Sequence, residues 1–504
     1  MTFFESLLAL LFAAIVALQV SRRLSLPYPA MLALAGVVVA FIPGAPMIGI
    51  DPSTALALFI APVLLDAAFD FPLDAAQKLW RPLAILAVGA ILLTTATVAW
   101  IGVAYVGLPL AAAVALGAIV APPDAAAATA VLGSVSLPRR TIAVLKGESL
   151  FNDATALLLF GAALAVQASG GFGTGVAARL ALAAPGGIAF GIAAAFVIRW
   201  LGSFVVGTLG GNILQFINAF GVWIIAEHLH LSPVLAVVGC AMTIARTGGS
   251  GSPRTRVHNF AVWATVVFLL NVLAFLLMGM QARLIVGRMT TVHLWDSLGV
   301  ASVVILAVVV SRIVLVMAWN VLAKRFAGIR GDLPAPSVAQ GVFVSWCGMR
   351  GLLTLATAFA LPSNFPQRDV VVLTAFAVVL VTLILQGMTL RPLIRWLGLD
   401  TVDDPERELS EARRDLATAG AAALAPLQGH DAAALRLAYV VRGTDREAAY
   451  RDAGLAAVKA ERERLQALRD DGALSDDSYY RLQEEIDWRE LSLLPDGERR
   501  IEES

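Results

Sequence analysis

Two carboxylates five residues apart lie inside an apolar stretch of this sequence. The stretch reads GESLFNDATALLLF, residues 147–160, and its polar side chains are Glu148, Ser149, Asn152 and Asp153. At about 100° per residue, these four side chains span an arc of about 140° on one side of a helix. An ionised group is costly at membrane depth, so this arc should face protein or a water-filled cavity, where a carboxylate can bind a proton or a cation.

Further charged side chains fall in other apolar stretches, namely Asp66, Asp124, Arg312 and Arg350. Since a buried carboxylate is often half of an ion pair, we expect Glu148 and Arg350 to form an architectural pair. Asp153 then has no permanent counter-charge and is the candidate for binding a proton or an ion. Asp66 is the candidate for a third carboxylate of that site. Arg312 is either a second counter-charge or a structural arginine facing the bundle.

Two apolar segments contain residues that interrupt a helix. One reads AIVAPPDAAAATA, where Pro122 and Pro123 lack amide donors, and the other reads SWCGMRGLLTLA, with Gly348 and Gly351. Each interruption lies in the fifth segment of its half of the chain. This pattern is typical of inverted repeats whose two broken helices cross at the membrane midplane.

Broken helices expose partial charges at their ends. Asp124 directly follows the proline pair, and Arg350 lies between the two glycines. We expect these two side chains, with Arg312 as a further compensating charge, to offset the exposed helix ends.

The composition indicates an all-α polytopic membrane protein. The chain has 504 residues, of which 59% are hydrophobic and 15% charged, and its mean hydropathy is +0.79. With about 20 apolar residues per span, we predict about thirteen transmembrane helices, near residues 3–20, 27–43, 53–70, 80–106, 108–133, 145–168, 176–198, 210–227, 231–246, 259–281, 297–323, 336–362 and 369–397.

The distribution of basic residues predicts the orientation. If the N-terminus lies outside, the loops that hold most of the Lys and Arg residues are cytoplasmic, as the positive-inside rule requires. Pairs such as Arg22–Arg23 and Lys324–Arg325 then lie on the cytoplasmic side. We therefore predict a multi-pass protein of a cell membrane with a cytoplasmic C-terminus.

Residues 1–400 and 401–504 differ in charge. The first part has 22 Lys and Arg against 13 Asp and Glu, whereas the second has 15 against 24. The apolar spans also stop near Asp400. We predict a transmembrane domain over 1–400 and a cytoplasmic acidic tail over 401–504, with two charged helices between residues 445 and 491 and a regulatory role.

Several function classes find no support in the sequence. It contains no G-x-x-x-x-G-K-S/T phosphate-binding loop, so ATP is not expected as an energy source. It contains no nucleophile-and-base constellation and no histidines at metal-ligand spacing, so neither an enzyme nor a cofactor is expected. Nucleic acid is not an expected partner. These features favour a secondary transporter in contact with membrane lipid.

The motifs resemble those of the cation:proton antiporter 1 family, the bacterial NhaP-type sodium/proton antiporters and their eukaryotic exchanger relatives. GESLFNDATA is similar to the family's central signature, and WCGMRGLLTLATAFALP to its arginine-bearing helix. APVLLDAAF resembles the segment that usually carries a glutamate. The similarity spans Thr2 to about Leu397. It implies a homodimer that exchanges sodium or lithium for protons and serves pH and sodium homeostasis.

The resemblance also implies roles for single residues. Asp153 would bind the sodium ion or the proton, with Asn152 as its paired asparagine. Ser149, Asp66 and the backbone at Pro123 would supply further oxygen ligands. In the family, an asparagine at the position of Asn152 accompanies electroneutral exchange, so we expect no net charge movement.

The resemblance further implies the Glu148–Arg350 bridge and a place for Asp124 at the crossing point. The chain departs from the family in two places. The usual Thr-Asp-Pro is replaced by Pro123-Asp124-Ala125, and Asp66 replaces the usual glutamate, which shortens its reach by one methylene.

Two other functions stay open on the sequence alone. Potassium/proton exchange is one, because composition does not set the size of the selected ion. A membrane sensor that signals through its tail is the other, although the polar cluster at 148–153 argues against it.

Overall fold

The computed structural model describes residues 3–24, 26–42, 52–69, 71, 73–124, 139–171, 173–205, 208, 210–247, 253–289, 291–326, 337–399, 405–427, 429–441, 446–470 and 476–495. Every regular element in these residues is a helix. The chain divides into two compact units, Met1–Asp400 and Thr401–Ser504. The division coincides with the change in charge seen in the sequence. Ala125, part of the departure noted above, lies outside the described residues.

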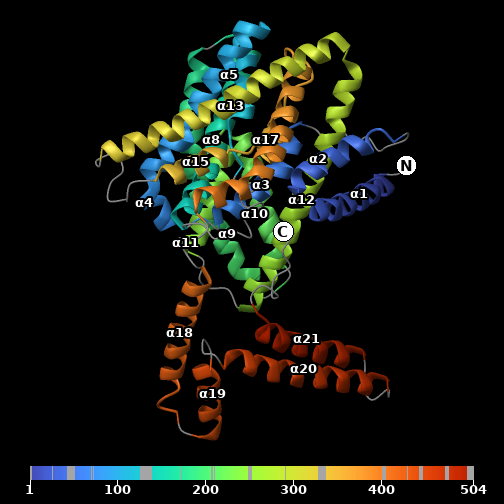
Figure 1. Cartoon of the computed structure of the whole chain (residues 1–504), viewed down its shortest axis with the longest axis vertical. Coiled ribbons are helices and arrows are strands. Elements are labelled where there is room, and N and C mark those ends of the chain that lie inside the picture. Colours follow the sequence, from blue (N-terminus) through green and yellow to red (C-terminus); the bar gives the residue numbers. More distant parts are fainter. Residues whose placement is uncertain are drawn as a thin grey trace. The chain divides into compact units, whose positions relative to one another are not determined.

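The first unit is a bundle of helices (Figure 1). Its described elements are α1 (Phe3–Leu24), α2 (Tyr28–Val39), α3 (Pro52–Phe69), α4 (Leu73–Ala84), the π-helical turn η1 (Ile85–Gly89), α5 (Ala90–Val106), α6 (Leu110–Val120), α8 (Arg139–Ser169), α9 (Thr174–Val205), α10 (Gly210–His228), α11 (Pro233–Thr247), α12 (Pro253–Arg288), α13 (Thr291–Arg325), α15 (Val338–Trp346), α16 (Leu352–Phe359) and α17 (Arg368–Leu397).

The first unit has the helices of a polytopic membrane protein. Seven described helices are long and apolar enough to cross a membrane, and five shorter helices are apolar too. With the interrupted pair α15 and α16, they match the predicted segments in position. The all-helical membrane class is therefore confirmed, while the number of thirteen crossings stays a prediction.

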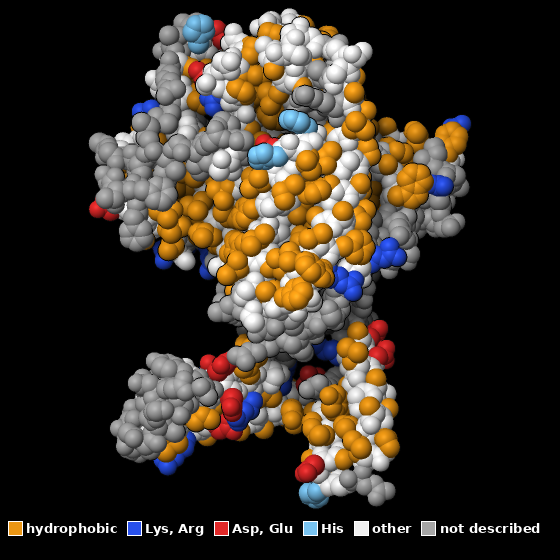
Figure 2. Space-filling model, turned by 180° about the vertical axis from the view of Figure 1, so that it is seen from behind, with side chains coloured by type: hydrophobic (Ala, Val, Ile, Leu, Met, Phe, Trp, Pro, Cys, Tyr) orange, Lys and Arg blue, Asp and Glu red, His pale blue; other side chains and the backbone are white. Residues whose placement is uncertain are grey.

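Large apolar side chains cover the outside of the first unit. Phe12 is 70% exposed, Trp100 63% and Leu306 64%. Figure 2 shows hydrophobic side chains spread over much of the visible face of this unit. Soluble proteins rarely expose apolar patches of this extent, whereas a lipid-facing surface requires them.

Small residues allow a close helix contact between α2 and α12. A Cβ placed on Gly36 would overlap the carbonyl group of Leu276, and one placed on Gly279 would overlap the carbonyl group of Ala33. Lipid tails are as apolar as the helix surfaces, so such close backbone packing is a main source of association between membrane helices.

Both predicted helix interruptions begin where the sequence places them. α6 ends at Val120 and residues 122–124 are not helical, because the proline pair supplies no amide donors. α15 ends at Trp346, residues 348–351 run without helical structure, and α16 then begins at Leu352. A Cβ on Gly351 would overlap the Asp124 carboxylate. The two interruptions therefore lie against each other.

The second unit contains two pairs of packed helices. α18 (Pro405–Ala423) packs against α19 (His430–Val441), and α20 (Glu447–Asp470) against α21 (Asp476–Leu493). Arg462 of α20 donates to Asp487 of α21 at 2.8 Å, and Arg489 donates to Glu461 at 2.5 Å. The two predicted charged helices correspond to α20 and α21, and the α18–α19 pair adds to them.

The contact between α2 and α12 generates a stability prediction. We expect Gly279→Ala to lower the unfolding free energy by about 1–3 kcal/mol, because the new methyl group must push the backbone of α2 away. A fall in the melting temperature of the purified protein in detergent would report this loss. The control is Gly299→Ala in α13, where a Cβ meets nothing within 4 Å. Equal melting temperatures for the two variants would contradict the prediction.

Candidate functional site

Glu148 of α8 pairs with Arg312 of α13. Arg312 Nη1 donates to Glu148 Oε1 at 2.5 Å and Nη2 donates to Oε2 at 3.0 Å, with both side chains at most 3% exposed. The predicted pair of Glu148 with Arg350 is therefore wrong. The physical reason is that α13 and α8 both contact α15 and η1, which brings Arg312 to Glu148, while backbone carbonyl groups engage Arg350.

Arg312 also compensates a helix end, as predicted. Its Nη2 donates to the carbonyl oxygen of Val344 at 3.2 Å. Val344 belongs to the last turn of α15, where carbonyl groups have no partner within the helix. Arg312 thus neutralises Glu148 and satisfies the end of α15 with one guanidinium group.

Arg350 caps the end of the other interrupted helix. Its Nε donates to the carbonyl of Val120 at 3.0 Å, Nη2 donates to that of Ala121 at 3.4 Å, and Nη1 donates to that of Gly348. The side chain is 1% exposed, and no ion pair to it occurs within the described part of the chain. A cation at the carboxyl end of a helix is favourable because of the partial negative charge there.

Asp124 caps the start of α16, the helix that follows the second interruption. Its carboxylate accepts the amide hydrogen of Leu352, the first residue of α16, at 3.2 Å. Its own amide donates to the carbonyl of Met349 at 2.7 Å. As predicted, Asp124 lies at the crossing of the two interruptions. Each interruption therefore supplies the charged side chain that caps a helix end in the other.

Asp153 lines a small cavity beside this crossing. The cavity has a volume of about 30 Å³, and its lining includes Asp153, Asp124 and further residues of the two interruptions. The Asp153 side chain is half-buried and makes no hydrogen bond or ion pair to any residue that the structure describes. A carboxylate in this position has oxygen lone pairs available for a proton or a cation.

The predicted ligands around Asp153 are only partly brought together. Ser149 donates its hydroxyl hydrogen to the carbonyl of Pro123 at 3.5 Å, which joins α8 to the first interruption. Asn152 turns away from the cavity, because its amide donates to Glu148 Oε1 at 3.4 Å and the side chain is fully buried. Asp66 of α3 is half-buried and does not line the cavity.

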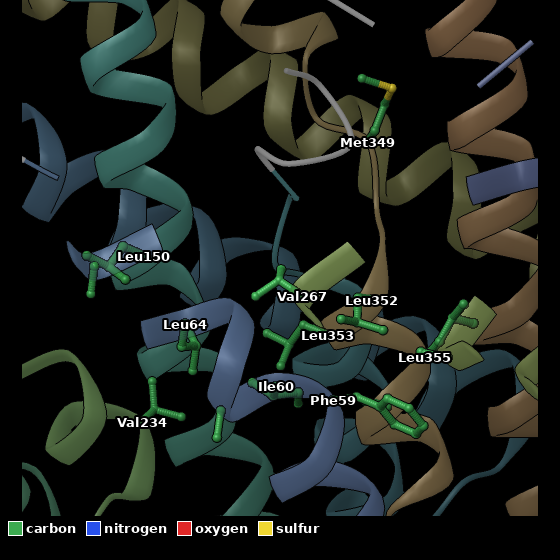
Figure 3. Close-up of a cluster of buried hydrophobic side chains, with 14 of the residues drawn as sticks. Phe59, Ile60, Leu64, Leu150, Val234, Val267, Met349, Leu352, Leu353 and Leu355 are labelled. Atoms are coloured by element: carbon green, nitrogen blue, oxygen red, sulfur yellow. The ribbon is translucent and has the colours of Figure 1, made fainter. Parts of the chain in front are cut away.

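Apolar side chains that the sequence did not single out form the rest of the cavity wall. Ile60, Val63 and Leu64 come from α3, and Leu352 and Leu353 from the start of α16. Figure 3 shows several of these side chains packed between the two helices. The sequence could not identify them as cavity-lining residues, because most helices of this chain are apolar. They exclude water and so strengthen the electrostatic interactions of Asp153.

A larger cavity of about 670 Å³ lies at one end of the bundle, lined by charged and polar residues of the α13 and α17 starts such as Asp296 and Arg368. Elsewhere in the unit, Leu116 and Ile119 of α6 belong to an apolar cluster with Leu361.

The described residues contain no group of three or more His, Cys, Asp or Glu side chains that could hold a metal ion.

The fold and the site together define a class. A helical membrane bundle with two interrupted helices that cross beside a carboxylate is the architecture of a secondary active cation transporter. The chain belongs to the sodium/hydrogen exchanger family, because the family model described as "Sodium/hydrogen exchanger, transmembrane" matches residues 8–396.

Individual relatives agree with the family. The chain is 29% identical over 436 residues to an uncharacterised Na+/H+ exchanger of Mycobacterium tuberculosis, covering 83% of this chain and 79% of that one. It is 27% identical over 504 residues to a sodium, potassium, lithium and rubidium/H+ antiporter of Bacillus pumilus, covering 93% and 74%. The fold is similar to that of the sodium proton antiporter MjNhaP1 from Methanocaldococcus jannaschii at pH 8, with a TM-score of 0.58, 16% identity and coverage of 79% and 100%.

The corrected ion pair leads to a prediction about coupling. We expect Glu148→Gln and Arg312→Gln each to destabilise the protein by about 3 kcal/mol or more, because each leaves the opposite charge buried alone. The double variant should lose little more than either single variant. Melting temperatures in detergent would give the coupling in a double-mutant cycle.

The control cycle combines Glu148→Gln with Arg350→Gln. Its two effects should be closer to additive, because Arg350 bonds to backbone carbonyls and not to Glu148. Additive effects for residues 148 and 312, with strong coupling for 148 and 350, would contradict the assigned pairing.

Proposed function

We propose that this chain exchanges sodium or lithium for protons one for one, with Asp153 as the group that binds either the cation or the proton. The single observation that carries the proposal is the position of Asp153, on a cavity at the crossing with no partner among the described residues. Family membership supports sodium/proton exchange as the activity.

Sodium suits the oxygen atoms near Asp153, since a hard cation prefers carboxylate, carbonyl and water ligands. A cavity of about 30 Å³ holds about one water molecule. A hydrated ion does not fit, so sodium must exchange most of its water for protein oxygens. Asp124 and Pro123 also line the cavity, and we propose that their oxygen atoms contribute to the site. Asp66 and Ser149 would join through a movement of α3 or α8.

The other charges of the site are already compensated. Glu148 is neutralised by Arg312, while Arg350 and Asp124 cap helix ends. Asn152 adds no charge. Asp153 is then the group whose charge is offset by a sodium ion in one form and by a proton in the other. Both forms carry the same net charge, so their exchange across the membrane is electroneutral.

With Asp153 occupied, the protein would change between an inward-facing and an outward-facing state by rocking of one helix bundle against another. The orientation we propose has the N-terminus outside. Basic residues support it, since they end helices that would all run inward: α1 with Arg22 and Arg23, α11 with Arg246, and α13 with Lys324 and Arg325.

In a bacterial inner membrane, such exchange would serve pH and sodium homeostasis. We further propose a homodimer, and a cytoplasmic regulatory role for the unit Thr401–Ser504. The α20–α21 pair carries alternating acidic and basic side chains on its surface, as a solvated helical domain requires.

A second candidate is potassium/proton exchange. The observation that favours it is the Bacillus pumilus relative, whose name includes potassium and rubidium beside sodium and lithium. The apolar wall of the cavity supplies no feature that selects one ion size. A sensor without transport is disfavoured, because it has no need for an available carboxylate at a helix crossing.

The central test is Asp153→Asn in proteoliposomes loaded with a pH-sensitive dye. We expect sodium-driven proton movement to fall at least about a hundredfold, since the asparagine side chain cannot release a proton. The same assay with lithium and potassium separates the two candidate functions. Asp296→Asn, on an exposed part of α13 outside the Asp153 cavity, is the matched control and should retain exchange. Sodium-dependent proton movement in the Asp153 variant would refute the proposal.

A further inference from the structure

Thr382 of α17 holds the second interruption through one hydroxyl group. Its Oγ1 accepts the amide hydrogen of Arg350 at 3.1 Å. The same hydroxyl donates to the carbonyl of Val378, one turn earlier in α17, at 2.7 Å. The side chain is 1% exposed. The hydroxyl therefore uses its hydrogen within its own helix and presents a lone pair to the interruption.

Arg350 needs this acceptor because residues 348–351 have no helical hydrogen-bond ladder. A buried backbone amide without a partner costs about 1–3 kcal/mol. The neighbouring hydrogen bonds of this stretch, from Arg350 to Val120 and from Asp124 to Met349, join one interruption to the other. The bond from Thr382 differs, because it ties the crossing to an uninterrupted helix of 30 residues.

A second threonine of α17 supports the same arrangement. Thr389 lies two helical turns after Thr382, on the same face, and accepts the indole N–H of Trp346 at 2.8 Å. Trp346 is the last residue of α15. The α17 helix thus bonds to the end of α15 and again to Arg350, and so holds the second interruption at two points.

We propose that Thr382 is a positioning residue for cation exchange. By fixing the backbone of Arg350, it fixes the adjoining Gly351 and Leu352, which line the Asp153 cavity. It also fixes the amide of Leu352 that the Asp124 carboxylate accepts. The proposal rests on the proposed function at Asp153, and Thr382 itself touches neither the ion nor the proton.

The experiment compares Thr382→Val, which keeps the shape and loses the hydroxyl, with Thr382→Ser, which keeps the hydroxyl. Thr382→Ala replaces the valine variant if that protein is not recovered. Thr357→Val is the matched control, because Thr357 is 3% exposed and its hydroxyl bonds only to carbonyls of its own helix. For each full-length protein, hydrogen–deuterium exchange of the Arg350 amide and the half-saturating sodium concentration in proteoliposomes are measured.

Loss of the acceptor should speed exchange of the Arg350 amide by about tenfold and raise the half-saturating sodium concentration by a similar factor, as expected for one lost hydrogen bond. The serine variant and the Thr357 control should stay within about twofold of the unmodified protein. Such rescue by serine separates a hydrogen-bond role from a packing role.

Three results would overturn the inference: an unchanged Arg350 amide in Thr382→Val, a faster amide with unchanged sodium dependence, or equal impairment of the valine and serine variants. Failure of the proposed function gives a different result, namely full exchange in Asp153→Asn. In that event the amide exchange still decides whether Thr382 holds the interruption.

Discussion

Two interrupted helices meet inside this membrane protein, and the polar groups at their ends must be satisfied without water. Arg350 donates to the carbonyls that end α6, and Asp124 accepts an amide that begins α16. The main chain of Asp124 also bonds to Met349. An unsatisfied backbone group in this setting costs about 1–3 kcal/mol, so the crossing is stable only when both side chains are in place. The geometry of the cavity beside it follows from this mutual capping.

Capping also determines which charges remain available. A charge at membrane depth needs compensation, and the pair of Glu148 and Arg312 provides its own. Arg350 and Asp124 are occupied by helix ends. Asp153 remains on the cavity wall, next to the crossing yet outside its hydrogen bonds among the described residues. The same arrangement that stabilises an interrupted fold thus leaves the Asp153 carboxylate for the exchangeable ion that we propose.

The sequence predicted the interruptions and the cavity carboxylate well, because proline and glycine break helices through local chemistry and because helical periodicity places Asp153 on a polar arc. It failed on the arginines. Hydropathy locates Arg312 and Arg350 at depth, but their partners depend on how α13 packs against α15, which lies beyond local pattern. The contact of Asn152 with Glu148 is different, because it is local and joins two residues four apart on α8. Thr382 gave no signal, since a threonine in an apolar helix usually bonds only to its own backbone.

The account stands on competition between one proton and one sodium ion at Asp153. The most direct measurement is proton release from the purified protein in weakly buffered detergent solution when sodium is added. At a pH where the ion-free protein is protonated, we expect about one proton released per sodium ion bound, and none from Asp153→Asn, because that side chain has no proton to exchange. Undiminished release from the asparagine variant, or about two protons per sodium ion from the unmodified protein, would contradict the account.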